Sequence, residues 1–283
     1  MKIIECPRDA MQGLHEFIPT EKKALYINQL LKVGFDTIDF GSFVSPKAIP
    51  QLRDTAEVLD QLNLSDTPTK LLAIIANVRG AEQAIQFEEI DYLGFPLSIS
   101  EQFQLRNTNK SIQEALQTVA DIQNLCVKHN KELVAYISMG FGNPYGEPFN
   151  EEIVAEFVEK LTALGIGIIS LSDTIGVAEP DVIENVFGRS ISAYPSTEFG
   201  AHFHSTPDKT LEKLEAAYAA GCRRFDTAIK GFGGCPMAKD DLTGNIATER
   251  LLSYMHSISQ ETGLDKQAFD QAMLMSLDVF PQN

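Results

Sequence analysis

The sequence lacks any apolar run that approaches the roughly 20 residues a transmembrane helix needs. Its opening segment, Met1–Glu5, reaches an acidic side chain too early for a signal peptide. We therefore expect a cytoplasmic protein that has no membrane partner.

Positive charge is scarce as well. Lys and Arg together number 23 against 39 Asp and Glu, which gives a formal net charge of −16 at pH 7. A chain with this balance repels a phosphate backbone, so nucleic acid is excluded as an expected partner. A small anionic ligand would need a local basic or backbone-amide site.

Cysteine is rare and is scattered along the chain. The four residues Cys6, Cys126, Cys222 and Cys235 form no CxxC pair, which excludes a zinc knuckle and a disulfide framework. Reduced thiols in a reducing compartment fit this usage best. We interpret Cys6, Cys126 and Cys222 as packing residues.

Linkers and low-complexity segments are also missing, so we expect a single domain over residues 1–283. What the chain does have is a regular alternation of short apolar segments with amphipathic ones. The apolar segments suit strands that are buried on both faces of a parallel sheet. The predicted strands are Ile3–Cys6, Thr37–Phe40, Leu71–Ala76, Tyr92–Phe95, Leu133–Ser138, Ile166–Leu171, Glu198–Phe203 and Arg224–Ala228.

Helix boundaries can be predicted between these strands. Ser111 and Glu114 have the spacing of a capping box, and Asn150 can cap the helix that follows it. Thr206 with Pro207 predicts another helix start. Glycine stop signals follow three helices. The predicted helices and stops are Glu21–Val33, Ser111–Val127, Glu151–Leu164, Gly34, Gly165 and Gly221.

Eight strand-helix units of about 25–40 residues predict an α/β fold, a (β/α)8 TIM barrel. An extra C-terminal helix is expected over Asp265–Leu277. The alternative, an open doubly wound sheet, usually has a glycine-rich phosphate turn after its first strand. Here the first strand is followed by Pro7, Arg8 and Asp9 instead.

Catalytic residues of a (β/α)8 barrel lie at the carboxyl ends of its strands. Nearly all side chains of the chain that could take part in catalysis lie at these predicted strand ends. Charged residues scattered over the surface would not be concentrated in this way. The candidate site residues are Arg8, Asp9, Asp39, Asp173, His202, His204, Cys235 and Asn245. By contrast, we expect His15, His129 and His256 to be surface or helix-end residues.

The pair His202 and His204 is the most informative local pattern. Positions i and i+2 of a strand point the same way, so both imidazoles can reach one metal ion. The pattern alone favours the alternative, one packed histidine and one incidental histidine. The position of the pair at a strand end, just before an expected helix cap, gives the two interpretations equal weight. Adding Asp9 and Asn245 gives a nitrogen and oxygen ligand set that favours Mg²⁺ or Mn²⁺ and leaves positions open for substrate oxygens.

Arg8, Asp39 and Asp173 each have two interpretations. Arg8 is a permanent cation that can stabilise an enolate oxygen, or it forms a rim salt bridge with Asp39 or Asp173. Each carboxylate can transfer protons, orient a neighbour or act as an ion-pair partner. Ion pairing is the commonest role for a single barrel-rim carboxylate.

Cys235 lies in the glycine-rich segment Gly231–Pro236, the kind of loop that closes over a site. Its thiol could exchange a proton if its pKa were lowered, or it could be a small packing residue.

Several of these motifs together resemble a known family. Arg8, Asp9 and Gln12, with the histidine pair, are similar to elements shared by metal-dependent barrel lyases and synthases. Further segments resemble the 3-hydroxy-3-methylglutaryl-CoA lyase branch. They are Ser42–Asp54, Ser100–Ala115, Leu171–Pro180, Gly231–Pro236 and Thr243–Glu249.

This resemblance implies a ligand set and catalytic roles. It implies Asp9, His202, His204 and Asn245 as metal ligands, Arg8 as the cation for the enolate and Cys235 as a proton-transfer group. It also implies Asp173 as an active-site carboxylate and a proton-shuttle role for His202. The chain departs from the family pattern at Ala10, Asp39, Ser205 and the longer segment between Cys235 and Asn245.

The resemblance implies cleavage of an acyl-CoA substrate, 3-hydroxy-3-methylglutaryl-CoA or a close 3-hydroxy acyl-CoA, to acetyl-CoA and acetoacetate. The cofactor would be Mg²⁺ or Mn²⁺, and relatives imply a homodimer. Alternatives are a Claisen-condensing synthase, an aldolase on a free hydroxy acid and a non-catalytic barrel. The last conflicts with the retention of so many catalytic groups at one rim.

Overall fold

Eight parallel strands close into one barrel in the computed structural model, which describes residues 1–234 and 243–280. The sheet order is β6-β5-β4-β3-β2-β1-β8-β7, and β6 also pairs with β7, so the ring is complete. The predicted (β/α)8 TIM barrel is confirmed. The strands are β1 Lys2–Glu5, β2 Thr37–Ser42, β3 Lys70–Ile74, β4 Tyr92–Ser98, β5 Glu132–Ser138, β6 Ile168–Asp173, β7 Glu198–Ser205 and β8 Arg224–Thr227, with a short antiparallel β9, Gly244–Asn245, beside β7.

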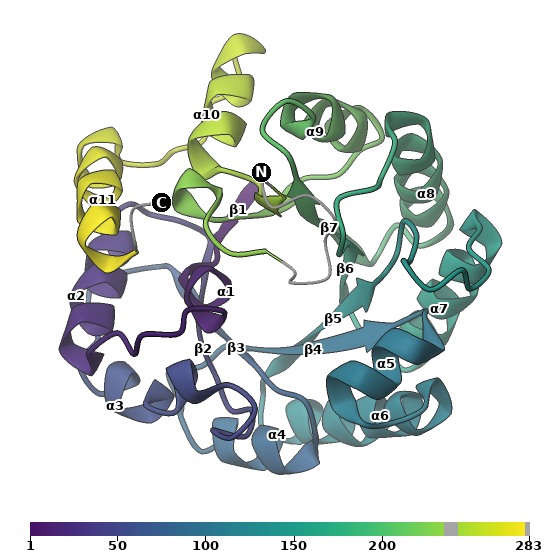
Figure 1. Ribbon diagram of the computed structural model, residues 1–283, viewed down its shortest axis with the longest axis horizontal. Coiled ribbons are helices and arrows are strands. Elements are labelled where there is room, and N and C mark those ends of the chain that lie inside the picture. The colour runs from purple at the N-terminus through teal and green to yellow at the C-terminus, as the bar shows by residue number, and fades with distance from the viewer. Residues whose placement is uncertain (235–242, 281–283) are drawn as a thin grey trace.

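Helices form a ring around this barrel (Figure 1). Their apolar faces pack against the outer side of the strands in one continuous core. The helices are α1 Pro7–Gln12, α2 Thr20–Leu31, α3 Thr55–Leu59, α4 Val78–Ala84, α5 Glu101–Thr108, α6 Ile112–Lys128, α7 Glu151–Ala163, α8 Pro180–Ala193, α9 Thr210–Ala219, α10 Thr248–Ser257 and α11 Lys266–Val279, with 3-10 turns at Pro50–Leu52 and Ile229–Gly231.

A second, smaller apolar cluster includes side chains of neighbouring strands β3 to β6. It consists of Leu72, Tyr92, Val134, Tyr136 and Ile168. The strands are covered on both faces, and all residues of β2, β6 and β8 are buried. This double burial explains why the strands appear in the sequence as short apolar runs.

Most predicted helix boundaries are confirmed. Ser111 and Glu114 form the capping box, and Asn150 accepts a hydrogen bond from the amide of Ile153. Gly165 has a positive φ of 77°, a conformation that glycine adopts without steric cost at a helix end. Gly34 and Gly221 also have positive φ.

Two local expectations are wrong. Thr206 does not cap a helix, because β7 continues to Ser205 and a turn follows, in which the Lys209 amide donates to the Thr206 carbonyl. Helix α9 begins only at Thr210. The segment after the first strand, for which no helix was predicted, forms α1, in which Asp9 lies and Pro7 occupies the first turn.

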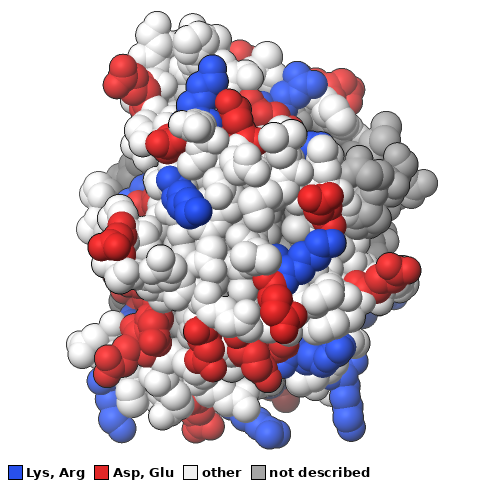
Figure 2. Space-filling view, turned by 90° about the vertical axis from the view of Figure 1, so that its left-hand side faces the viewer, with Lys and Arg blue, Asp and Glu red and all other residues white. Residues whose placement is uncertain are grey.

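The extra C-terminal helix is confirmed as α11, with Asp265 as its capping residue. It packs beside α2, where the Gln29 side chain donates to the Ala268 carbonyl. The side of the barrel that carries these helices shows acidic and basic groups interspersed around an uncharged central area (Figure 2). None of the helices in the described ranges has the length and apolarity that crossing a membrane requires.

Candidate functional site

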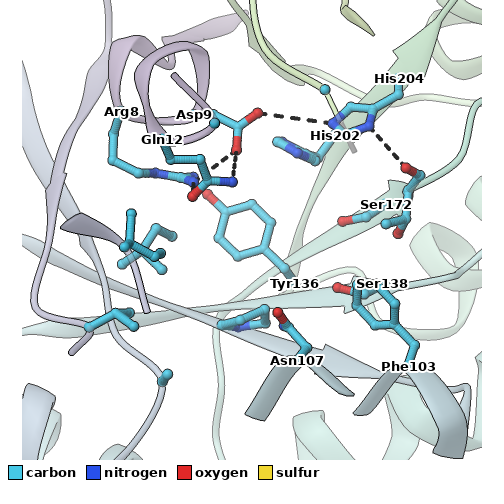
Figure 3. Close-up of a pocket in the computed structure, with 18 of the residues that line it drawn as sticks. Arg8, Asp9, Gln12, Phe103, Asn107, Tyr136, Ser138, Ser172, His202 and His204 are labelled. Carbon is cyan, nitrogen blue, oxygen red and sulfur yellow. Dashed lines mark hydrogen bonds and ion pairs between the residues drawn. The ribbon is translucent and has the colours of Figure 1, made fainter. Parts of the chain in front are cut away.

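A pocket of about 500 Å³ opens at the rim where the strands end. Helix α1 contributes Arg8, Asp9 and Gln12 to one part of its wall, and β7 contributes His202 and His204 to another (Figure 3). The structure therefore brings together four of the predicted site residues that come from opposite ends of the chain.

Asp9, His202 and His204 form a compact group that can hold a metal ion. One ligand atom from each residue lies within 4.8 Å of the other two. The imidazole rings of β7 have centroids 5.5 Å apart, as expected for side chains at positions i and i+2. The structure thus favours the metal interpretation of the histidine pair over incidental packing.

His204 has one ring nitrogen directed to the protein and the other left available. Its Nδ1 donates to the Thr174 carbonyl oxygen at 2.9 Å. Its Nε2 is buried, has no hydrogen-bond partner within the described part of the chain and lies 4.0 Å from Asp9 Oδ2. Burial, together with the charge of His202, lowers the pKa of His204 to about 4. The ring is therefore neutral near pH 7, and a buried lone pair of this kind fits a metal cation.

The two oxygens of Asp9 have different surroundings. Oδ1 accepts hydrogen bonds from Arg8 at 2.8 Å and from Gln12 at 3.2 Å, whereas Oδ2 faces His204 and Asn245. Burial alone would raise the pKa of Asp9, but the charges of Arg8 and the two histidines, with the hydrogen bond from Asn245, together outweigh burial, so the pKa falls to about 2. Asp9 is a carboxylate at neutral pH with one oxygen directed at the histidines.

Asn245 lies beside this group in β9, where it pairs with His204 in the antiparallel register. Its amide nitrogen donates to Asp9 Oδ2 at 2.7 Å and to the Phe232 carbonyl at 2.8 Å. The nitrogen rather than the oxygen therefore faces Asp9, and ligation through Oδ1 requires the amide to rotate. A Cβ on Gly233, whose φ is 88°, would lie 2.8 Å from the Asn245 amide nitrogen. Only glycine fits this close approach of the loop.

Arg8 forms the ion pair with Asp39 that was one of its two interpretations. Nε donates to both Asp39 oxygens at 3.0 and 3.1 Å, and Nη2 donates to the same carboxylate. Nη1 donates to Asp9 and to Gln12. Within the described residues, these bonds occupy four of the five guanidinium N–H groups, which leaves one on Nη2 for a ligand in the pocket. The two interpretations of Arg8 are compatible.

Asp39 is fully buried in β2 behind Arg8 and does not line the pocket. Burial raises its pKa to about 6, and the charge of Arg8 opposes that rise. Its contacts make it an orienting partner of Arg8.

Asp173 is also fully buried at the end of β6, outside the lining of the pocket. Lys213 of α9 donates to it at 2.6 Å, and the amides of Val177 and Ala178 donate at 2.9 and 3.0 Å. The carboxylate thus fixes the loop that includes Thr174, whose carbonyl orients His204. This is a supporting arrangement, and the predicted catalytic role of Asp173 stays a prediction.

The sequence reasoning missed two buried groups that contact the site residues. Asp226 of β8 accepts a hydrogen bond from His202 at 3.1 Å, and Lys213 donates to the His204 carbonyl at 3.1 Å. Burial would lower the pKa of His202, but the hydrogen bond and charge of Asp226, with the charge of Asp9, together outweigh burial and the pKa is raised. Alternation along β8 could have placed Asp226 beside Arg224 on one face. Cys235 lies outside the described residues.

The remainder of the pocket wall is largely apolar. It is formed by side chains from the segment after β2, from β3 and the segment after it, from β4 and from α5: Val44, Ala48, Ile49, Ile74, Ala76, Pro96 and Phe103. Arg106 and Asn107, also from α5, add polar groups, and Arg106 is exposed. This wall offers a surface for an acyl chain with a basic group at its edge.

Comparison with known proteins identifies the family of this chain. The HMGL-like family model matches residues 2–275. Hydroxymethylglutaryl-CoA lyase YngG of Bacillus subtilis is 35% identical over 258 residues, covering 91% of this chain and 85% of the relative. A Pseudomonas aeruginosa 3-hydroxy-3-isohexenylglutaryl-CoA/hydroxymethylglutaryl-CoA lyase is 32% identical over 94% of this chain and 88% of its own length.

A solved structure agrees with these relatives. The HMG-CoA lyase of Acinetobacter baumannii, in complex with coenzyme A and 3-methylmalate, superposes with a TM-score of 0.90 at 33% identity. The match covers 99% of this chain and 90% of that one.

Proposed function

This chain belongs to the HMGL-like family, and from that premise we propose that it is a metal-dependent carbon–carbon lyase. The proposed reaction is the cleavage of 3-hydroxy-3-methylglutaryl-CoA, or a close 3-hydroxy acyl-CoA, to acetyl-CoA and acetoacetate or its homologue. The names of the relatives support this substrate class. The relatives are lyases on CoA thioesters, which disfavours the condensing synthase and the aldolase on a free acid.

One observation in the structure supports metal-dependent activity in addition to membership of the family. The buried Nε2 of His204 has no partner in the described ranges, and it faces a carboxylate oxygen of Asp9 across 4.0 Å. A buried polar atom without a hydrogen bond is costly unless a ligand satisfies it. The nitrogen and oxygen donors suit a hard divalent cation such as Mg²⁺ or Mn²⁺.

We propose Asp9, His202 and His204 as metal ligands, with Asn245 as a fourth after rotation of its amide. When bound, the cation would supply Lewis acidity and orientation for the 3-hydroxyl and carboxylate oxygens of the substrate.

The reaction itself is a retro-Claisen cleavage. The 3-hydroxyl transfers its proton to a base in the site, the C2–C3 bond breaks, and the electron pair of that bond enters the thioester as an enolate. Protonation of C2 then gives acetyl-CoA, and C3 becomes the ketone of the second product. The remaining N–H of Arg8 can donate to the enolate oxygen, and the buried ion pair with Asp39 holds the guanidinium in place for it.

Proton transfer is the step that the resemblance assigns to Cys235 and His202. The Nδ1 of His202 is engaged by Asp226, so Nε2 is the ring nitrogen available to the pocket. Metal ligation and proton transfer would compete for this one atom, and we propose ligation for His202. For proton transfer we propose Cys235, as the resemblance implies, and this assignment stays a prediction.

The experiment is an assay of metal-free protein with 3-hydroxy-3-methylglutaryl-CoA, with and without Mn²⁺ or Mg²⁺. We expect acetoacetate and acetyl-CoA in equal amounts, and only with metal. The free acid, 3-hydroxy-3-methylglutarate, serves as the control substrate and should not be cleaved. Folded, metal-loaded protein that cleaves neither this thioester nor its longer 3-alkyl homologues would contradict the proposal.

A further inference from the structure

We propose that Asp226 is the positioning residue that makes His202 a metal ligand by fixing the imidazole in the tautomer with a free Nε2. This inference rests on the proposed metal centre and assigns a role to a residue on β8 that no motif in the sequence indicates.

Register between neighbouring strands places the two side chains together. His202 of β7 lies directly opposite Asp226 of β8 in the parallel ladder. The His202 Nδ1 to Asp226 Oδ2 distance is 3.1 Å. The Asp226 side chain is 1% exposed and that of His202 is 13% exposed, so solvent cannot readily replace this bond.

The chemistry of the contact selects one tautomer. An ionised carboxylate can only accept a hydrogen bond, so Nδ1 of His202 must carry the proton and Nε2 keeps its lone pair. His204 reaches the same tautomer by a different route, because its Nδ1 donates to the Thr174 carbonyl. Both rings therefore present the same kind of nitrogen, and carboxylate support of a ligating histidine also raises its basicity.

Further contacts restrict the orientation of the His202 ring. Tyr136 packs edge-on against it, with centroids 5.5 Å apart and an interplanar angle of 81°. Asp226 has no Lys or Arg within ion-pair distance in the described ranges, so Oδ2 is not engaged by a competing cation. The buried Arg224, two residues away on the same strand, interacts with Asp226 only through its charge.

The first test measures Mn²⁺ binding to metal-free protein by electron paramagnetic resonance, without substrate. Asp226→Asn is the test variant, because its amide NH₂ can donate to Nδ1 and stabilise the tautomer with a protonated Nε2. We expect its Mn²⁺ affinity to fall by about 10–100-fold. Asp54→Asn is the control, because Asp54 is also a buried carboxylate but pairs with Lys23 away from the site. Its Mn²⁺ affinity should stay within about twofold of wild type.

The second test needs no variant. Nitrogen-15 NMR of histidine-labelled, metal-free wild-type protein, at a pH high enough to keep the His202 ring neutral, should show His202 protonated at Nδ1 and not at Nε2. Protonation at Nε2 would overturn the inference even if Asp226→Asn fails to fold. Unchanged Mn²⁺ affinity in folded Asp226→Asn would also overturn it and would leave the proposed lyase function standing. Failure of wild-type protein to bind Mn²⁺ would instead remove the metal centre itself.

Discussion

Single ring nitrogens and carboxylate oxygens determine what this site can do. His204 Nε2 and Asp9 Oδ2 face each other, and every other polar atom of these two side chains is held by the protein. The orientation of both groups is thus fixed before any ligand arrives. Such preorganisation removes part of the free-energy cost of binding a cation.

His204→Ala tests the ligand role at this scale. It removes a ligand atom, so Mn²⁺ affinity and cleavage activity should be lost together. The measurement is Mn²⁺ binding by calorimetry in parallel with the product assay. His256→Ala, at an exposed position on α10, is the control and should change neither quantity. Loss of activity with full metal affinity would refute the ligand role of His204.

Arg8→Gln tests the enolate role. Loss of the donor should lower kcat by about 100–1000-fold, the usual effect of removing one oxyanion donor. Mn²⁺ affinity should change much less, because Asp9 keeps the hydrogen bond from Gln12. The measurement is kcat against metal affinity, with exposed Arg189→Gln as the control. A near-wild-type kcat would show that Arg8 serves only as a structural ion-pair partner.

How far the sequence predicts the site differs from residue to residue. Side chains two positions apart on a strand point the same way, and this was enough to predict that His202 and His204 lie together. Asp9 was added because catalytic residues of a barrel lie at the carboxyl ends of its strands. Asp226 could not be found in this way, because its contact depends on the register between two strands that no local pattern fixes. The orientation of the Asn245 amide depends on the Phe232 carbonyl, which is likewise a tertiary contact.

Among the secondary-structure elements, the loop after β6 links the buried ion pair of Asp173 and Lys213 to the histidine centre. The pair has a distance of 2.6 Å and is almost completely inaccessible to solvent. Because Asp173 also accepts the amides of Val177 and Ala178, it fixes the loop whose Thr174 carbonyl orients His204. The ion pair therefore acts on the site through the loop.

A matched pair of variants tests this link. Lys213→Met and Lys23→Met each leave a buried aspartate without its cation, which should lower the free energy of unfolding by about 3–5 kcal/mol. Only Lys213→Met should also weaken Mn²⁺ binding, because only Lys213 supports His204, both through the loop and through its own bond to the His204 carbonyl. Chemical denaturation and Mn²⁺ titration measure the two effects. Equal Mn²⁺ affinity in both variants would rule out the link.

The elements themselves were predicted where the signal is local. The capping box at Ser111 and the glycine stop at Gly165 depend on residues close in sequence, and both are confirmed. The predicted helix start at Thr206 is wrong because β7 extends to pair with β9, a contact between residues about 40 positions apart. Helix α1 was missed because it is only six residues long.

For the whole molecule, Glu5 is a buried link between the two ends of the chain. One oxygen accepts from the Ile229 amide at 2.8 Å and the other from the Thr248 hydroxyl at 2.6 Å. Glu5 thereby joins β1 to the segment after β8 and to α10. Burial raises its pKa from the usual 4.5 to about 8, and the two hydrogen bonds only partly oppose this rise.

This shift predicts a pH-dependent stability. Between about pH 4.5 and pH 8 the folded state holds a proton on Glu5 that the unfolded chain has released. The contribution is fully present below pH 4.5 and is lost as the pH rises through 8, at up to about 1.4 kcal/mol per pH unit. Glu5→Gln should remove this dependence, so the Tm of the variant should rise relative to the Tm of wild type between pH 5 and pH 9.

Thermal unfolding across this pH range measures the difference. Exposed Glu184→Gln is the control and should follow the wild-type profile. A constant Tm difference between Glu5→Gln and wild type over the whole range would contradict the buried, protonated state of Glu5.

The barrel was predictable at the scale of the whole chain because eight apolar segments with intervening helices leave few ways to bury both faces of a parallel sheet. Oligomeric state does not follow from this pattern, and the homodimer stays a prediction. So does the exact acyl group, because pocket shape depends on side chains from several separate loops.

The most direct test of the account is a crystal of this protein soaked in Mn²⁺, with anomalous diffraction used to locate the metal. We expect one strong peak between Asp9, His202 and His204, within coordination distance of the carboxylate and both imidazoles and beside Asn245. No peak there from folded protein, or a peak bound elsewhere, would contradict the proposed metal centre.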